Sequence, residues 1–215
     1  MKTKPVERYS KSEERLNIIS HAIGLILAII GTLFLVLKAI KLHSNLAILS
    51  VVIYGMSMII LYAASTFYHY STRPEIRYKL QIFDHASIYF LIAGTYTPFA
   101  MITLNGTMGW IIFGLTWSFA LAGVILKIFF TGRFNVLSTI MYLVMGWSVI
   151  PVVFPLIDAL TLNGFWWLLA GGVSYTIGAV LFLFENLKFN HAIFHGFVLL
   201  GTIAHFISVY WYVLV

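Results

Sequence analysis

Hydrophobic residues form seven long blocks along the chain, separated by short breaks that contain polar residues or glycine. The blocks cover residues 17–38, 45–69, 81–103, 109–130, 135–155, 164–185 and 190–214. Each is about 20 residues long, the length that an α-helix needs to cross a bilayer. The pattern predicts an all-α polytopic membrane protein in which residues 17–215 form a single domain, a bundle of seven transmembrane helices.

The segment before the first block has a different character. Residues 1–16 carry charges of both signs, and Ser10 and Glu13 have the spacing of a capping box at the start of a helix. We expect a cytoplasmic N-terminal segment in which a short interfacial helix leads into the first span.

Composition supports a membrane protein and narrows the possible chemistry. Of the 215 residues, 61% are hydrophobic and 9% are charged, whereas soluble domains carry about 25% charged residues. The chain has no cysteine, so disulfides and thiolate metal sites are excluded, and a metal would need His, carboxylate or hydroxyl ligands. The net charge of +6 comes from basic residues in the membrane-flanking segments. We therefore expect no nucleic-acid partner.

The distribution of the basic residues also predicts an orientation. Of the 13 Lys and Arg residues, all but Lys38 and Lys41 lie in the N-terminal segment or in the breaks on the same side of the membrane. Because basic residues accumulate on the cytoplasmic side, the N-terminus is expected in the cytoplasm and the C-terminus outside. This orientation is the reverse of that of a G-protein-coupled receptor.

Several ionisable residues fall at one predicted membrane depth. His69 ends the second span, Asp84 begins the third, and His191 and His195 begin the seventh. Two histidines at i and i+4 share a helix face and can direct both rings to one metal ion. A third histidine from another helix, His69, would complete a three-His zinc site with an open fourth position. Ser65, one turn before His69, and Asp84 would then hold the attacking water or accept its proton.

The alternatives remain open at this point. Buried histidines often make only structural hydrogen bonds. Haem is disfavoured because adjacent turns of one helix cannot supply both axial ligands. His205 is about 15 Å deeper than His195 along the helix and too far away to join the site.

Other residues near the expected site have less definite roles. His21 is either a partner of a metal ligand or interfacial, and His85 points about 100° away from Asp84 on the same helix. Glu185 is either an accessory carboxylate or an ion-pair partner of Lys188. Pro98 is expected to bend or end the regular helix of the third span.

Four segments together resemble the bacterial hemolysin III family of the progestin and adiponectin receptor (PAQR) superfamily. They are "EERLNIISHAIG" at 13–24, "STFYHY" at 65–70, "DHASIYFLIAGTYTPF" at 84–99 and "HAIFHGFVLLGTIAHF" at 191–206. The resemblance implies a zinc ion, Zn2+, held by His69, His191 and His195, with Ser65 and Asp84 around a bound water. In eukaryotic relatives this site is linked to ceramide hydrolysis, and bacterial members are associated with membrane-lipid homeostasis and named hemolysins.

The leading functional prediction is a zinc-dependent hydrolase that cleaves a lipid amide or related acyl bond in the bacterial plasma membrane. Asp84 would accept a proton, Ser65 would orient the water or an oxyanion, and the membrane lipid would arrive laterally between helices. Two other functions stay open. One is a sensor of membrane fluidity in which the metal is only structural, and the other is a cytolytic protein.

Overall fold

The computed structural model describes residues 9–132, 134–184 and 186–215, and within them seven helices are long and apolar enough to cross a membrane. The seven-helix, all-α prediction is therefore confirmed, and the protein is a multi-pass membrane protein. The elements are α1 Lys11–Lys41, α2 Asn45–Tyr70, α3 Pro74–Pro98 with its π-helical extension η1 Phe99–Leu104, α4 Gly106–Phe130, α5 Asn135–Gly146, the 3-10 turn η2 Ile150–Val152, α6 Val153–Leu160, α7 Leu162–Phe182, and α8 Asn190–Ser208 with its π-helical end η3 Val209–Val213.

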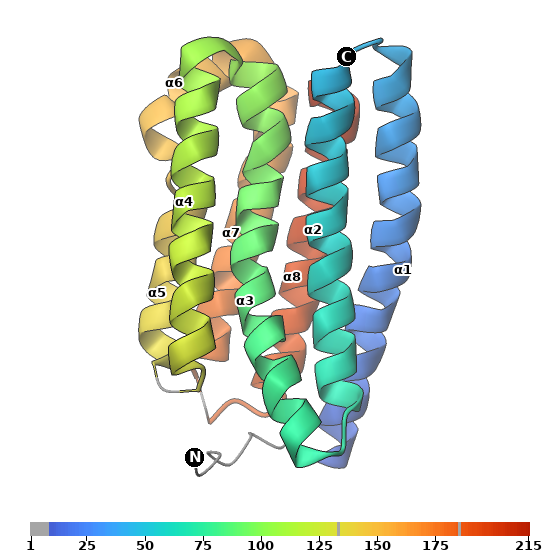
Figure 1. The fold of residues 1–215 in the computed structure, drawn as a ribbon, viewed down its shortest axis with the longest axis vertical. Coiled ribbons are helices and arrows are strands. Elements are labelled where there is room, and N and C mark those ends of the chain that lie inside the picture. Colours follow the sequence, from blue (N-terminus) through green and yellow to red (C-terminus); the bar gives the residue numbers. More distant parts are fainter. Residues whose placement is uncertain (1–8, 133, 185) are drawn as a thin grey trace.

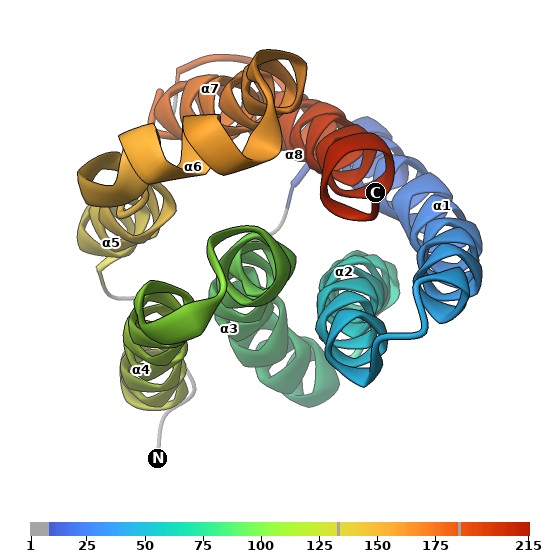
Figure 2. The same cartoon turned by 90° about the horizontal axis from the view of Figure 1, so that it is seen from above.

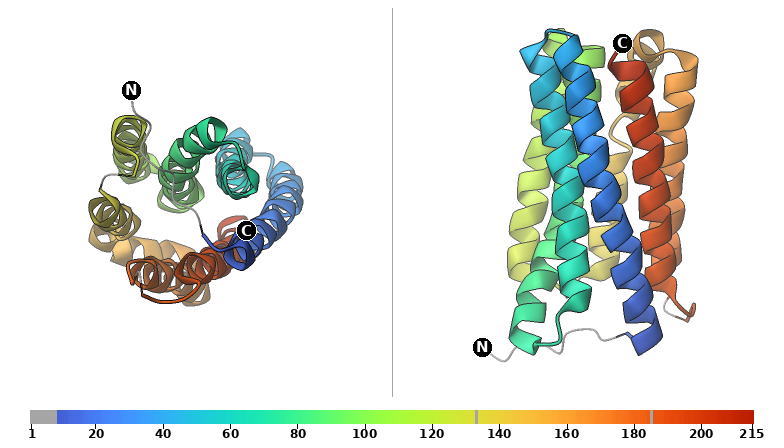
Figure 3. Two further views of the ribbon diagram at one scale, coloured as in Figure 1. Left: turned by 90° about the horizontal axis from the view of Figure 1, so that it is seen from below. Right: turned by 90° about the vertical axis from the view of Figure 1, so that its right-hand side faces the viewer.

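The helices form a closed ring in which sequence neighbours are spatial neighbours (Figures 1 and 2). α8 completes the ring by packing between α7 and α1, so the first and last helices lie side by side (Figures 2 and 3). Because the chain passes along the bundle seven times, the start of α1 and the end of η3 lie at opposite ends of the bundle (Figure 1). The outer surface is largely apolar, as a lipid-facing surface requires.

α1 begins before the first apolar block. Ser10 is its N-cap, and the Ser10 side chain accepts a hydrogen bond from the Glu13 backbone N–H. Glu13 and Glu14 in the first turn and Lys38 and Lys41 in the last turn match the helix dipole. Residues 11–16 thus form the first turns of the same helix that makes the first span. Residues 1–8 lie outside the described part of the chain.

The third span departs from regular α-helix at Pro98, as expected. Proline has no N–H to donate and clashes with the preceding turn, and the chain continues as the π-helix η1. Thr95 and Thr97 donate hydrogen bonds to the carbonyls of Leu91 and Ala93, at 2.7 and 2.9 Å. The two hydroxyl groups are therefore themselves satisfied by carbonyls of the preceding turn, as the membrane interior demands.

The fifth span is broken, although a continuous apolar helix over 135–155 was expected. α5 ends at Gly146, and the chain resumes helical structure at η2 and α6. Glycine is a weak helix former, and Pro151 and Pro155 cannot donate to the preceding turn. The Tyr96 hydroxyl donates to the Gly146 carbonyl at 2.7 Å. The Gly146 carbonyl at the break therefore has a hydrogen-bond partner inside the bundle.

Candidate metal centre

Three buried histidines meet at the end of the bundle where α1 begins. His69 comes from the last turn of α2, and His191 and His195 come from the first turns of α8. Their ligand atoms all lie within 4.8 Å of one another, and Nε2 of His69 is 3.1 Å from Nε2 of His191. The structure thus brings together three side chains that the sequence places far apart.

The contact between His69 and His191 has the spacing of two ligands on one tetrahedral metal ion. Zn–N bonds of about 2.05 Å at tetrahedral angles separate two ligand nitrogens by about 3.3 Å. The observed 3.1 Å between the two Nε2 atoms is close to that spacing. The donor set, three imidazoles without a thiolate, is one that zinc uses at open sites.

The outward-facing nitrogens of the three rings contact the first part of the chain. His69 Nδ1 is 2.8 Å from Glu14 Oε2. His195 Nδ1 is 3.3 Å from Ser20 Oγ, and His191 Nδ1 is 3.1 Å from the Tyr9 hydroxyl. None of these contacts was expected from the sequence.

A buried arginine links α1, α2 and α3 beside the cluster. Arg77, near the start of α3, pairs with the Glu14 carboxylate. Its Nη1 also donates to the carbonyls of Tyr68, His69 and Ser71 at 3.2–3.3 Å. These carbonyls lie in the last turn of α2 and at its C-cap, where few backbone N–H groups remain to pair with them. The guanidinium therefore ties the helix end that carries His69 to the carboxylate that contacts the same histidine.

Asp84 and Ser65, the expected water-binding pair, are also buried at this end. Asp84 is 7% exposed and lines a cavity that His191 and His195 also line. The Ser65 hydroxyl lies beside the Asp84 carboxyl group, although its Oγ makes no hydrogen bond of ordinary geometry among the described residues. Asp84 and Ser65 thus lie together at the end of the bundle that holds the three histidines.

The remaining histidines have distinct positions. His21 is 3% exposed and its ring stacks on that of His195, with centroids 3.5 Å apart. His85 lines the same cavity as Asp84, in spite of its different direction on α3. His205 also lines the cavity but bonds through Nε2 to the Leu168 carbonyl at 3.0 Å, away from the cluster. Glu185 lies outside the described residues.

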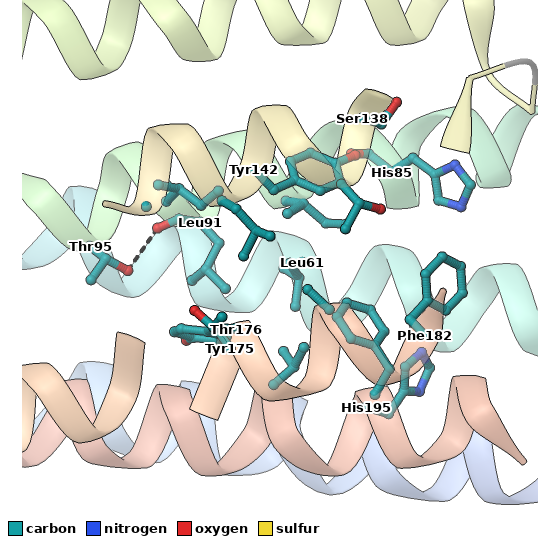
Figure 4. A pocket seen from close by; sticks show the side chains of 18 of the residues that line it. Leu61, His85, Leu91, Thr95, Ser138, Tyr142, Tyr175, Thr176, Phe182 and His195 are labelled. Atoms are coloured by element: carbon teal, nitrogen blue, oxygen red, sulfur yellow. Dashed lines mark hydrogen bonds between the residues drawn. The ribbon is translucent and has the colours of Figure 1, made fainter. Parts of the chain in front are cut away.

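The cavity extends from the histidines into the middle of the bundle (Figure 4). Its volume is about 150 Å³, and its walls come chiefly from α3, α5, α7 and α8. Along α3 it reaches from Asp84 to Tyr96, a rise of about 18 Å. Aliphatic and aromatic residues such as Leu91 and Phe182 dominate the wall (Figure 4). Such a space suits a linear apolar chain whose polar end lies at the histidines.

Fold and site together define a class: seven-helix membrane proteins with a three-histidine cluster at one end of an apolar intramembrane cavity. The chain matches the family described as "Haemolysin-III related" over residues 9–206, and it belongs to that family. It is 46% identical to "Hemolysin-3" of Bacillus cereus over 202 residues, which are 94% of this chain and 92% of the relative. "Hemolysin-3 homolog" of Bacillus subtilis (strain 168) is 44% identical over 204 residues, 95% of this chain and 96% of the relative.

A human protein extends the relationship beyond bacteria. "Monocyte to macrophage differentiation factor" of Homo sapiens is 28% identical over 166 residues, which are 74% of this chain and 68% of the relative. The human relative belongs to the PAQR family. The resemblance that the histidine-containing segments indicated is therefore confirmed at the level of the family.

The contacts from Tyr9, Glu14 and Ser20 to the three histidines are the features of the candidate site that sequence reasoning missed. A signal was present in "SKSEERLNIISH", where Ser10, Glu14, Asn17 and His21 recur at intervals of three or four residues. Such a polar stripe at the start of a transmembrane helix indicates a face that points into the bundle rather than to lipid.

Proposed function

We propose that the protein is a zinc-dependent hydrolase of a membrane lipid, acting on an amide or related acyl bond in the bacterial plasma membrane. The observation that carries this proposal is that the histidine cluster adjoins the apolar cavity. A buried cluster of three histidines with a fitting spacing borders an apolar cavity with a buried carboxyl group in its wall. A purely structural metal site needs neither the cavity nor the carboxyl group.

His69, His191 and His195 would hold the ion through the ring nitrogens that face one another. A zinc ion bound by three histidines supplies a Lewis acid that polarises a carbonyl group and lowers the pKa of a water toward about 7. Asp84 would take the proton from the attacking water and pass it to the leaving amine or alcohol. Ser65, buried beside Asp84, would orient the water or donate a hydrogen bond to the developing oxyanion.

The lipid would place its acyl chain in the cavity and its scissile carbonyl group at the histidines. Chain, cavity and cluster then form one line along the bundle axis. With the N-terminal side in the cytoplasm, as the basic residues indicate, the head group would lie near the cytoplasmic face. The products would be a fatty acid and the amine or alcohol that remains of the head group.

The decisive experiment measures zinc content and turnover on the same preparations. We would assay purified full-length protein, Asp84→Ala and His191→Ala against N-acyl and O-acyl lipids in mixed micelles, following release of fatty acid. Asp84→Ala should retain zinc but lose about 10²- to 10⁴-fold in turnover, the usual contribution of a general base. His191→Ala should lose zinc and activity together.

Asp158→Ala is the matched control, because Asp158 is an exposed carboxylate on α6 at the opposite end of the bundle. It should resemble the wild type in both measurements. A wild-type protein with stoichiometric zinc but no hydrolysis of any amide or ester lipid would refute the hydrolase and leave the metal as a structural clamp. A wild-type protein that binds no zinc would refute the metal centre itself.

A further inference from the structure

We propose that residues 9–20, which lead into α1 and form its first turns, act as a brace for the metal centre, in which Tyr9, Glu14 and Ser20 fix the rings of the three histidine ligands. The inference rests on the zinc site proposed above, but it concerns residues that bind no metal. Each brace residue contacts the Nδ1 atom of a different histidine, at 3.1, 2.8 and 3.3 Å respectively. The three ligands come from α2 and α8, yet all three contacts come from within twelve residues at the start of the chain.

The direction of two of these hydrogen bonds follows from the chemistry of the brace residues. Ser20 donates its own hydroxyl hydrogen to the Asn17 carbonyl at 3.1 Å, so its oxygen is left to accept from His195 Nδ1. An ionised Glu14 carboxylate can only accept, so the hydrogen it shares with His69 belongs to Nδ1 of that ring. In a neutral imidazole with its hydrogen on Nδ1, the lone pair for a metal is on Nε2.

The third contact completes the same arrangement. A tyrosine hydroxyl can accept as well as donate, and the Tyr9 hydroxyl meets Nδ1 of His191 at 3.1 Å while the two rings pack with centroids 4.7 Å apart. The Nε2 atom of His191 is the one that faces Nε2 of His69. All three rings are thus oriented with Nδ1 toward the brace.

Glu14 is itself held in place. Arg77 pairs with its Oε1, whereas His69 contacts Oε2. Because Arg77 also binds the carbonyls at the end of α2, the carboxylate and the histidine are fixed to the same anchor. A carboxylate that accepts from the far nitrogen of a histidine ligand orients the ring and makes it a better donor to the metal.

Asn17 lies beside the same contact. Its Nδ2 is 3.4 Å from His69 Nδ1, and its Oδ1 has no hydrogen-bond partner within the part of the chain that the structure describes. With the amide turned by 180°, the oxygen would accept from Nδ1 alongside Glu14. In either orientation Asn17 offers His69 Nδ1 only a neutral partner. Glu14 is therefore the brace residue whose loss is expected to weaken metal binding most.

The test compares zinc affinity in full-length wild type, Glu14→Ala and Glu75→Gln, by competition with a chromophoric zinc chelator in detergent. Loss of such a histidine partner typically weakens metal binding about 10- to 100-fold, and we expect that range for Glu14→Ala. Glu75→Gln is the control, because Glu75 is an exposed acid in the first turn of α3 at the same end of the bundle. It should bind zinc with wild-type affinity.

A second measurement separates positioning from a general structural role. The rise in Tm on zinc addition should shrink in Glu14→Ala, whereas a merely structural role would lower the Tm of the zinc-free and zinc-bound forms equally. Should Glu14→Ala fail to fold, Tyr9→Phe and Ser20→Ala remove single hydroxyl groups and should each weaken zinc binding several-fold.

The outcomes are distinguishable from failure of the proposed function. Wild-type protein that binds zinc, together with brace variants of unchanged affinity and unchanged zinc-dependent Tm, would overturn the brace and leave the metal centre intact. Wild-type protein that binds no zinc would overturn both.

Discussion

A methyl group added at Gly201 would collide with the ring of Tyr175 at the contact between α8 and α7. The new Cβ would lie 2.8 Å from Cζ and 2.9 Å from Cε1 and Cε2 of that ring, all shorter than carbon atoms normally approach. The ring cannot simply swing away, because its hydroxyl is bonded to Thr202 at 2.8 Å. Gly201→Ala therefore forces the helices apart or breaks that hydrogen bond.

The expected magnitude combines two opposing effects. Overpacking of this kind costs about 1–3 kcal/mol, while alanine in place of glycine favours the helix by about 1 kcal/mol. The net effect of Gly201→Ala is a destabilisation of about 1 kcal/mol. Gly196, one and a half turns earlier on α8, has nothing within 4 Å of an added Cβ, so Gly196→Ala should be stabilising by up to about 1 kcal/mol.

Thermal unfolding followed by circular dichroism, in one detergent and with a chelator present, measures the pair without a contribution from metal. For a chain of this length, 1 kcal/mol corresponds to about 2–4 °C, so the two variants should differ by about 4–8 °C. A Gly201→Ala variant as stable as Gly196→Ala, or more so, would refute the close packing of α8 on Tyr175.

Four further predictions follow from the site, the cavity and the topology. Chelation should lower the Tm of the wild type but not that of His69→Ala, because only the wild type gains stability from bound metal. Gly172→Leu, at a point where an added Cβ would face Trp147 at 3.9 Å in the cavity wall, should reduce hydrolysis of long-chain lipids more than of short-chain ones. The discrimination should be about fourfold for each methylene excluded, and equal loss for all chain lengths would contradict an acyl-chain cavity. Tyr62→Phe removes the 2.8 Å hydrogen bond to Thr202 and should lower the free energy of unfolding by about 1 kcal/mol in chemical denaturation. A variant as stable as the wild type would contradict this prediction. Alkaline phosphatase fused to the C-terminus should be active, since the basic residues predict that this end lies outside the cytoplasm. An inactive phosphatase fusion, together with an active fusion to a cytoplasmic reporter, would show that the orientation is the opposite one.

Much of the architecture follows from the sequence alone because two simple rules govern it. The length of each apolar block predicts a span. Because successive spans cross in opposite directions, their order determines which helix ends lie on the same side of the membrane. Helical periodicity then places His191 and His195 on one face, and the alternation of spans brings the end of α2 to the start of α8. These rules predict that His69 shares a membrane depth with that pair, whereas their convergence depends on how α2 and α8 both pack against α1.

The brace and the broken fifth span depend on packing that periodicity does not contain. Glu14 belongs to a charged stretch that could equally lie in the head-group region, and only the packing of α1 against α2 brings it to His69. His85 illustrates the same limit, because its exposure to the cavity depends on how α3 is rotated within the ring. Gly146 and Pro151 were visible in the sequence, but glycine and proline are tolerated within many transmembrane helices.

The adjacency of the first and last helices has a consequence for how the protein is made. Glu14 leaves the ribosome early, whereas His195 follows about 180 residues later, which at about 5–20 residues per second is roughly 10 to 40 seconds of translation. During that interval α1 and α2 are in the membrane with Glu14 and His69, but the two histidines of α8 have not yet been made. The site comes into existence only when α8 closes the ring. Zinc loading would therefore report that the newly made chain is complete, and a product truncated before its last helix could not acquire the ion.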